Sequence, residues 1–230
     1  MPLAGINIEW LLIIVIGIVG MLVQWRLQSV FTKYSHVGTS NGMTGRDVAE
    51  KMLRDNGIYD VRVTSTQGHL TDHYNPANKT VNLSESVYNS PSIAAAAVAA
   101  HECGHAVQHA RGYAWLEMRS KLVPLISITS RFSTWVIIIG MLTINTFPAL
   151  FWIGILMIAA SALFSIVTLP VEYNASARAL DWLRSTRTLD ASQMEGATIS
   201  LRWAARTYLV AALSAIATLL YSLVFARNRD

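Results

Sequence analysis

The residues best suited to chemistry are His101, Glu102 and His105, within the run HECGH. Histidines four positions apart share one face of an α-helix, so both imidazoles can bind one metal ion at about 2.0–2.1 Å. A glutamate directly after the first histidine projects beside the metal and can take a proton from bound water. The pattern therefore predicts a hydrolytic Zn2+ site, with His101 and His105 as ligands and Glu102 as general base.

A hydrolytic zinc site needs a third protein ligand and an open position for water. His109 lies about 12 Å along the helix axis from His101, too far for the two to share an ion, so we interpret it as a surface or supporting residue. Glu172 is the better candidate, because it follows a long apolar segment that should return the chain to the side of the histidines. A carboxylate at such a position is costly without a role or a partner. The alternative is an interfacial glutamate paired with Arg178 or Arg131.

The elements that must position these residues can be placed from local signals. An alanine-rich helix at about residues 91–110 should carry both histidines, with Ser90 or Ser92 as its cap. Short strands are predicted at 61–66 and 79–83. In zincin-like sites an edge strand before the metal helix holds the substrate by strand addition, and residues 79–84 are in the right place. A plain core strand is the alternative for that segment.

Composition indicates a membrane protein. Only 14% of the residues are charged and 53% are hydrophobic, whereas soluble domains carry about 25% charged residues. Charged side chains are absent from residues 10–25, 132–171 and 207–226, and such runs are typical of membrane spans. A single helix over the middle run would reach about 60 Å, so we expect a hairpin that turns near residues 145–148. The predicted spans are about 6–24, 130–146, 149–170 and 207–226.

The distribution of basic residues predicts the topology. Of 18 Lys and Arg residues, 16 lie in segments 26–131 and 171–206, which four spans would place on the same side. The positive-inside rule puts that side in the cytoplasm and both termini outside. We therefore expect a multi-pass protein of a bacterial-type inner (plasma) membrane with its active site on the cytoplasmic side. The basic residues are scattered, so nucleic acid is not an expected partner.

Three runs carry a resemblance to a known family: GHLTDHY at 68–74, VAAHECGHAVQH at 98–109 and TLPVEYNAS at 168–176. In this order, with a membrane hairpin between the second and third, they closely resemble the YugP-like family of membrane zinc metallopeptidases. The layout is also similar to that of the HtpX heat-shock protease and CAAX prenyl protease group, which build a gluzincin site.

This resemblance implies His101, His105 and Glu172 as zinc ligands and Glu102 as catalytic base. The HtpX-like pattern has a supporting Asp four residues after the Glu ligand, and here that position is Ser176. The support of the histidine is therefore open, with Asp72 or another carboxylate as a candidate.

The expected fold is a mainly α-helical multi-pass membrane protein, with a zincin-like α+β catalytic domain, short strands before the HExxH helix and four transmembrane helices. One membrane peptidase unit would span residues 1–230: transmembrane helix 1 at 6–24, a zincin-like cytoplasmic-side region at 26–121, a transmembrane hairpin at 130–170, a Glu-ligand helix and cytoplasmic segment at 171–206, and transmembrane helix 4 at 207–226.

The expected function is zinc-dependent endopeptidase activity on membrane-associated proteins or peptides. The partners would be that substrate and the lipid bilayer, and an oligomer or a regulatory membrane partner is also compatible with the sequence. Candidate donors for the oxyanion are His109, Arg178 and Tyr208. Cys103 should pack inward as a small apolar residue rather than bind metal.

Three rival interpretations remain. The first is a membrane scaffold or partner-binding protein with a degenerate site, although no ligand position is visibly lost. A transporter is disfavoured because the spans are nearly uncharged. A metal helix within the bilayer is disfavoured by the polar segment 86–92 (SVYNSPS).

Overall fold

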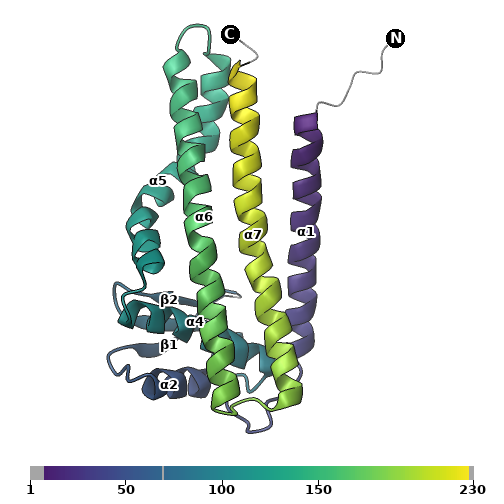
Figure 1. The fold of residues 1–230 in the computed structure, drawn as a ribbon, viewed down its shortest axis with the longest axis vertical. Helices are drawn as coiled ribbons and strands as arrows, with labels where there is room; N and C mark the ends of the chain where they lie inside the picture. The colour runs from purple at the N-terminus through teal and green to yellow at the C-terminus, as the bar shows by residue number, and fades with distance from the viewer. Residues whose placement is uncertain (1–7, 69, 228–230) are drawn as a thin grey trace. The chain divides into compact units, whose positions relative to one another are not determined.

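The structure is a computed structural model that describes residues 8–68 and 70–227. Residues 6 and 7 of the first predicted span and His69 of the GHLTDHY run lie outside the described residues. Four of the described helices are long and apolar enough to cross a membrane, which confirms a mainly helical multi-pass protein. They are α1 (Ile8–Ser35), α5 (Ala114–Leu142), α6 (Pro148–Ser185) and α7 (Ala191–Arg227) (Figure 1).

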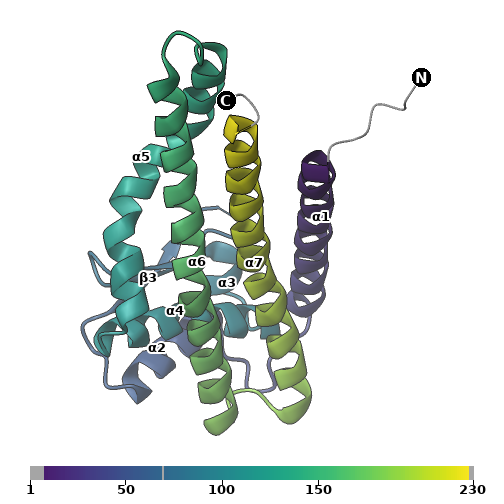
Figure 2. The same ribbon diagram turned by 45° about the horizontal axis from the view of Figure 1, so that its top comes forward.

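The chain divides into two compact units, and the first contains most of the apolar helical sequence: residues 1–22, 118–169 and 207–230. Within it, α5 and α6 form the predicted hairpin, joined by residues 143–147 (Figure 2). Two glycines let these helices approach closely. A Cβ on Gly140 would lie 2.6 Å from Phe151 Cα, and one on Gly154 would lie 2.7 Å from Ile137 Cδ1. Small residues at helix contacts are typical of membrane helix packing.

The second unit, residues 23–117 and 170–206, contains the sheet and the HECGH helix. Its sheet has the order β1-β3-β2, with β3 parallel to β1 and antiparallel to β2. The two predicted strands are confirmed as β1 and β3, whereas β2 was not predicted. Since β3 lies in the middle of the sheet, the expectation that residues 79–84 form a substrate-binding edge strand is wrong. The elements that lie wholly within this unit are α2 (Gly45–Asp55), β1 (Arg62–Thr66), β2 (His73–Asn75), β3 (Thr80–Ser84), α3 (Glu85–Tyr88) and α4 (Ile93–Ala110); parts of α1, α5, α6 and α7 belong to it as well.

Capping residues set where the helices of this unit begin. The Thr44 hydroxyl accepts a hydrogen bond from Asp47 N–H at the start of α2, and the Asp47 carboxylate accepts one from Thr44 N–H. This reciprocal capping box satisfies two helix-end donors. At the start of α4, Ser92 Oγ accepts from Ala95 N–H at 3.2 Å, so Ser92, one of the two predicted caps, is the cap of the HECGH helix.

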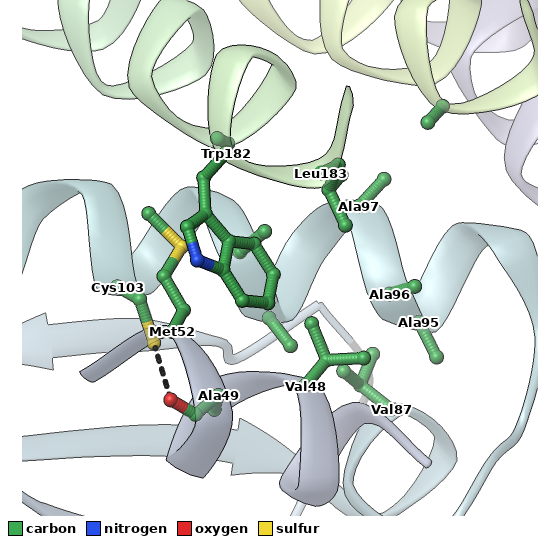
Figure 3. Close-up of a cluster of buried hydrophobic side chains, with 14 of the residues drawn as sticks. Val48, Ala49, Met52, Val87, Ala95, Ala96, Ala97, Cys103, Trp182 and Leu183 are labelled. Atoms are coloured by element: carbon green, nitrogen blue, oxygen red, sulfur yellow. Dashed lines mark hydrogen bonds between the residues drawn. The ribbon is translucent and has the colours of Figure 1, made fainter. Parts of the chain in front are cut away.

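The alanines of α4 form the centre of the main core. Ala94 to Ala97 are at most 1% exposed and pack among Val48, Met52 and Leu183 (Figure 3). Their small side chains let neighbouring helices come close, which the hydrophobic burial then stabilises. Cys103 is fully buried, with Sγ 3.5 Å from the carbonyl oxygen of Ala49, so the inward packing expected of this cysteine is confirmed.

Candidate metal centre

The two histidines of HECGH meet Glu172 in the second unit. His101 Nε2 lies 3.2 Å from Glu172 Oε2, and His105 Nε2 lies 3.6 Å from the same oxygen. The imidazole rings are 4.8 Å apart between centroids and nearly perpendicular. Glu172 is 1% exposed and His105 6%. Three side chains from two helices, α4 and α6, thus present one ligand atom each to a common point.

These distances fit a zinc ion. Ligand atoms about 2.0–2.1 Å from a tetrahedral zinc are separated from one another by about 3.3–3.4 Å. The two measured separations, 3.2 and 3.6 Å, bracket that value. Among the described residues, His101, His105 and Glu172 are the group of metal-binding side chains whose ligand atoms all lie within 4.8 Å of one another. The donor set of two imidazoles and one carboxylate is one that catalytic zinc uses.

Both histidines are held through Nδ1, so Nε2 of each faces the common point. Ser176 Oγ lies 3.1 Å from His101 Nδ1, and Gln108 Oε1 lies 3.0 Å from His105 Nδ1. Ser176 is therefore the residue that contacts the outer nitrogen of His101, a contact for which the sequence had given no single candidate. Asp72 does not, because its carboxylate accepts hydrogen bonds from Ser84 N–H and from the Ser84 hydroxyl.

Glu102 is held beside this cluster by the edge strand. Its Oε2 accepts a hydrogen bond from the backbone N–H of Tyr74 in β2 at 3.0 Å. Burial raises the pKa of Glu102 to about 7; the electrostatic effect of the His101 imidazole opposes this rise, and the negative charge of Glu172 adds to it. A buried carboxyl with a pKa near neutrality can both accept and release a proton, which is what a general base and acid requires.

The close approach of α4 and α6 depends on Gly104, the fourth residue of HECGH. A Cβ at this position would lie 2.6 Å from the carbonyl oxygen of Ala175 and 3.1 Å from its Cα. Ala175 is one turn from Glu172 on α6. The absence of a side chain at Gly104 therefore sets the separation between the helix with the histidines and the helix with the glutamate.

The other candidate residues have defined partners. His109 Nδ1 lies 2.7 Å from the Tyr74 hydroxyl, which agrees with a supporting place outside the ligand cluster. Arg178 Nε donates to Asn174 Oδ1 at 2.8 Å, so the alternative pairing of Glu172 with Arg178 does not describe the main contacts of this glutamate. Tyr208 belongs to the first unit.

Sequence reasoning missed four residues of the site: Tyr74, Gly104, Gln108 and Ser176 in its supporting place. Gln108 carried a signal, since residues three positions apart are neighbours on a helix and a glutamine at this position can contact the imidazole of His105. Gly104 carried one too, because glycine inside a helix costs about 1 kcal/mol relative to alanine and calls for a packing reason.

Comparison with known proteins agrees with this geometry. The profile of the family described as "Putative neutral zinc metallopeptidase" matches residues 9–227. A relative from Bacillus subtilis (strain 168), named "Putative membrane protease YugP", is 40% identical over 210 residues, which are 90% of this chain and 92% of the relative. No solved structure matches the chain.

Proposed function

Because the chain belongs to the YugP-like family of neutral zinc metallopeptidases, we propose that it is a membrane-embedded zinc endopeptidase with His101, His105 and Glu172 as its metal ligands. The observation that carries the proposal is the convergence of these three side chains at zinc-like separations. A carboxylate of suitable basicity stands directly beside them on α4, which is what the hydrolysis of a peptide bond requires.

In the proposed reaction Glu102 is the general base. When bound, zinc would lower the pKa of its water ligand and polarise the scissile carbonyl. Glu102 Oε2 is held by Tyr74 N–H, so Oε1 is the oxygen that would take the proton from water and pass it to the leaving amine. The burial that raises the pKa of Glu102 to about 7 favours the first of these transfers, because a more basic carboxylate takes the proton from water more readily.

We propose that the outer edge of β2 holds the substrate. β2 is an edge strand, and its antiparallel register with β3 pairs Tyr74 with Val81. The hydrogen bond from Tyr74 N–H to Glu102 means that this N–H points away from β3, toward the proposed catalytic carboxylate. An extended peptide added along this edge would pass beside Glu102, as strand addition generally positions backbones. β2 thus replaces β3 in the role expected from the sequence.

The helices long enough to cross a membrane support a membrane protein, and we propose that the catalytic unit faces the cytoplasm. Sixteen of the 18 basic residues lie in the segments that four spans would place on one side, and the positive-inside rule assigns that side. A peptidase built into the bilayer would encounter membrane-associated proteins or peptides first. We therefore propose these as its substrates.

The test compares purified wild-type protein with Glu102→Gln and Glu172→Ala. Glu102→Gln should keep stoichiometric zinc and lose cleavage of an unfolded protein substrate, because it removes the base but no ligand. Glu172→Ala should lose most zinc and all activity, because two histidines alone leave the site one ligand short. Zinc is measured by elemental analysis and cleavage by mass spectrometry. Wild-type protein without zinc, or Glu102→Gln with full activity, would refute the proposal.

A further inference from the structure

The side chain of Gln108 is the most fully enclosed polar group near the metal centre. It lies on α4, three residues after His105, and it is 0% exposed. Its amide nitrogen lies 2.8 Å from the carbonyl oxygen of Val171 and 3.0 Å from Asn174 Oδ1, both on α6. Its amide oxygen lies 3.0 Å from His105 Nδ1. Burying an amide this deeply is costly unless its hydrogen bonds are made, and here both ends make them.

The orientation of this amide is dictated by its surroundings. Amide nitrogen and oxygen are assigned from their partners, and the carbonyl of Val171 can only accept. The nitrogen of Gln108 must therefore face Val171, and the oxygen must face His105. Because an amide oxygen can only accept, His105 Nδ1 must carry the proton. Its Nε2 then presents a lone pair toward the candidate metal position.

A second, independent constraint gives the same orientation. Arg178 Nε can only donate, and it donates to Asn174 Oδ1 at 2.8 Å. Asn174 Oδ1 therefore stands as an acceptor, and the Gln108 nitrogen donates to it at 3.0 Å. Arg178 and Gln108 therefore both donate to Asn174 Oδ1, and His105 donates to Gln108 Oε1, so every donor and acceptor of this network is determined.

The other histidine has no such constraint. His101 Nδ1 meets the hydroxyl of Ser176 at 3.1 Å, and a hydroxyl either donates or accepts. The Ser176 hydroxyl therefore does not determine which nitrogen of His101 carries the proton. Both candidate ligands lie on one helix, but the contact at Nδ1 fixes the position of the ring proton in His105 and does not fix it in His101.

We infer that Gln108 is a positioning residue of the metal site, which fixes the metal-binding tautomer of His105 and holds the backbone of Val171, next to Glu172, against α4. One buried side chain thereby aligns two of the three proposed ligands. This inference rests on the proposed function. Contacts of this kind to a ligating histidine change metal affinity by about 10–100-fold when they are removed.

The first test is Gln108→Met, which keeps the length of the side chain and removes its hydrogen bonds. Zinc affinity, measured by competition with a chromogenic chelator, should fall by about 10–100-fold. In the metal-free protein, 15N NMR of the histidine rings should show His105 as a mixture of tautomers rather than the Nδ1–H form alone. The appearance of a tautomer mixture at His105 does not follow from loss of packing alone.

Gln193 offers a matched control, because it is also a buried glutamine of the second unit. Its amide nitrogen donates to the carbonyl oxygen of Gly38 and its amide oxygen accepts from the Ser40 hydroxyl, away from the ligands. Gln193→Met should lower the unfolding temperature and leave zinc affinity within about twofold, well below the range expected at a supporting contact.

A milder pair of variants at Asn174 covers the case in which Gln108→Met does not fold. Asn174→Leu removes the acceptor that orients Gln108 and should weaken zinc binding. Asn174→Asp keeps an acceptor for both Gln108 and Arg178 and should restore affinity to near the wild-type value. Restoration by the conservative variant identifies a hydrogen-bonding role, because aspartate keeps the acceptor that leucine removes.

The outcomes separate this inference from the proposed function. If His105→Ala abolishes zinc binding while Gln108→Met and Asn174→Leu bind zinc as tightly as the wild type, the role of Gln108 is refuted and the metal site stands. If the wild-type protein binds no zinc at these histidines, both proposals fall together.

Discussion

Replacing Gly104 with alanine should separate metal binding from folding. The added Cβ would lie 2.6 Å from the carbonyl oxygen of Ala175, whereas ordinary contact begins near 3.4 Å, so α4 and α6 must move apart by about 0.8 Å. Zinc ligand distances tolerate only about 0.2 Å. Glu172 is one turn from Ala175, so its carboxylate should move out of range of the two histidines.

The cost to folding should be much smaller than the loss of metal. Overpacking a buried contact lowers the free energy of unfolding by about 1–3 kcal/mol. Exchanging glycine for alanine inside a helix raises it by about 1 kcal/mol, because alanine has the higher helix propensity. We therefore expect a folded protein whose free energy of unfolding is lower by about 0–2 kcal/mol. Its zinc affinity should fall by about 10–100-fold or more, the range seen when a residue that supports a metal ligand is removed.

The assay is chelator competition for zinc, with thermal unfolding measured on the same samples. Gly17→Ala is the matched control, because Gly17 is also inside a helix and a Cβ there would meet nothing within 4 Å. It should leave zinc affinity unchanged. A Gly104→Ala protein that binds zinc with wild-type affinity would show that the approach of α4 and α6 does not set the site geometry.

Three further results are expected. Cys103 should resist alkylation in the folded protein, because burial raises the pKa of its thiol. Cys103→Ala should keep its full zinc content, and loss of zinc in this variant would show that the cysteine is part of the site. Asp47→Asn should lower stability at pH 7 by no more than about 0.5 kcal/mol, because the carboxyl is exposed and solvent screens it. Hydrogen bonds from Thr44 lower the pKa of the Asp47 carboxyl in the folded state. That contribution is present above the unfolded pKa of about 3.9 and disappears as pH falls through the lower folded pKa, so denaturation curves of the two proteins should converge in acid and a constant gap would argue against the cap. For the topology, an impermeant maleimide should label Phe147→Cys in intact cells and Tyr59→Cys only after lysis. The native Cys103 is buried and should not react. Labelling of Tyr59→Cys from outside would mean that the catalytic unit does not face the cytoplasm.

Local signals were sufficient for the elements that carry the site. The missing charges at 132–171 predicted the α5–α6 hairpin, and Ser92 marked the start of α4 as the structure has it. The spacing of His101 and His105 required a helix, and a helix is present there. Glu172 was expected from the topology, because the hairpin had to bring a carboxylate back toward the histidines, and above all from the resemblance to membrane zinc metallopeptidases.

The unpredicted features depend on contacts between distant segments. β2 has three residues, too few for a strand pattern, so neither its existence nor the central position of β3 was visible. The need for glycine at position 104 depends on how closely α6 approaches, which no local property of α4 encodes. The same holds for Gln108, whose partners Val171 and Asn174 lie more than 60 residues away.

The hydrogen bond from Tyr74 N–H to Glu102 has a thermodynamic consequence. In the proposed function the same strand orients the base Glu102 and pairs with the peptide, so the free energies of these two events are coupled. Whatever order the peptide imposes on β2 is also imposed on Glu102, and by linkage a correctly placed carboxylate strengthens peptide pairing. Peptides too short to pair along His73–Asn75 should therefore lose turnover rate as well as affinity, because their missing contacts would have held the base in place.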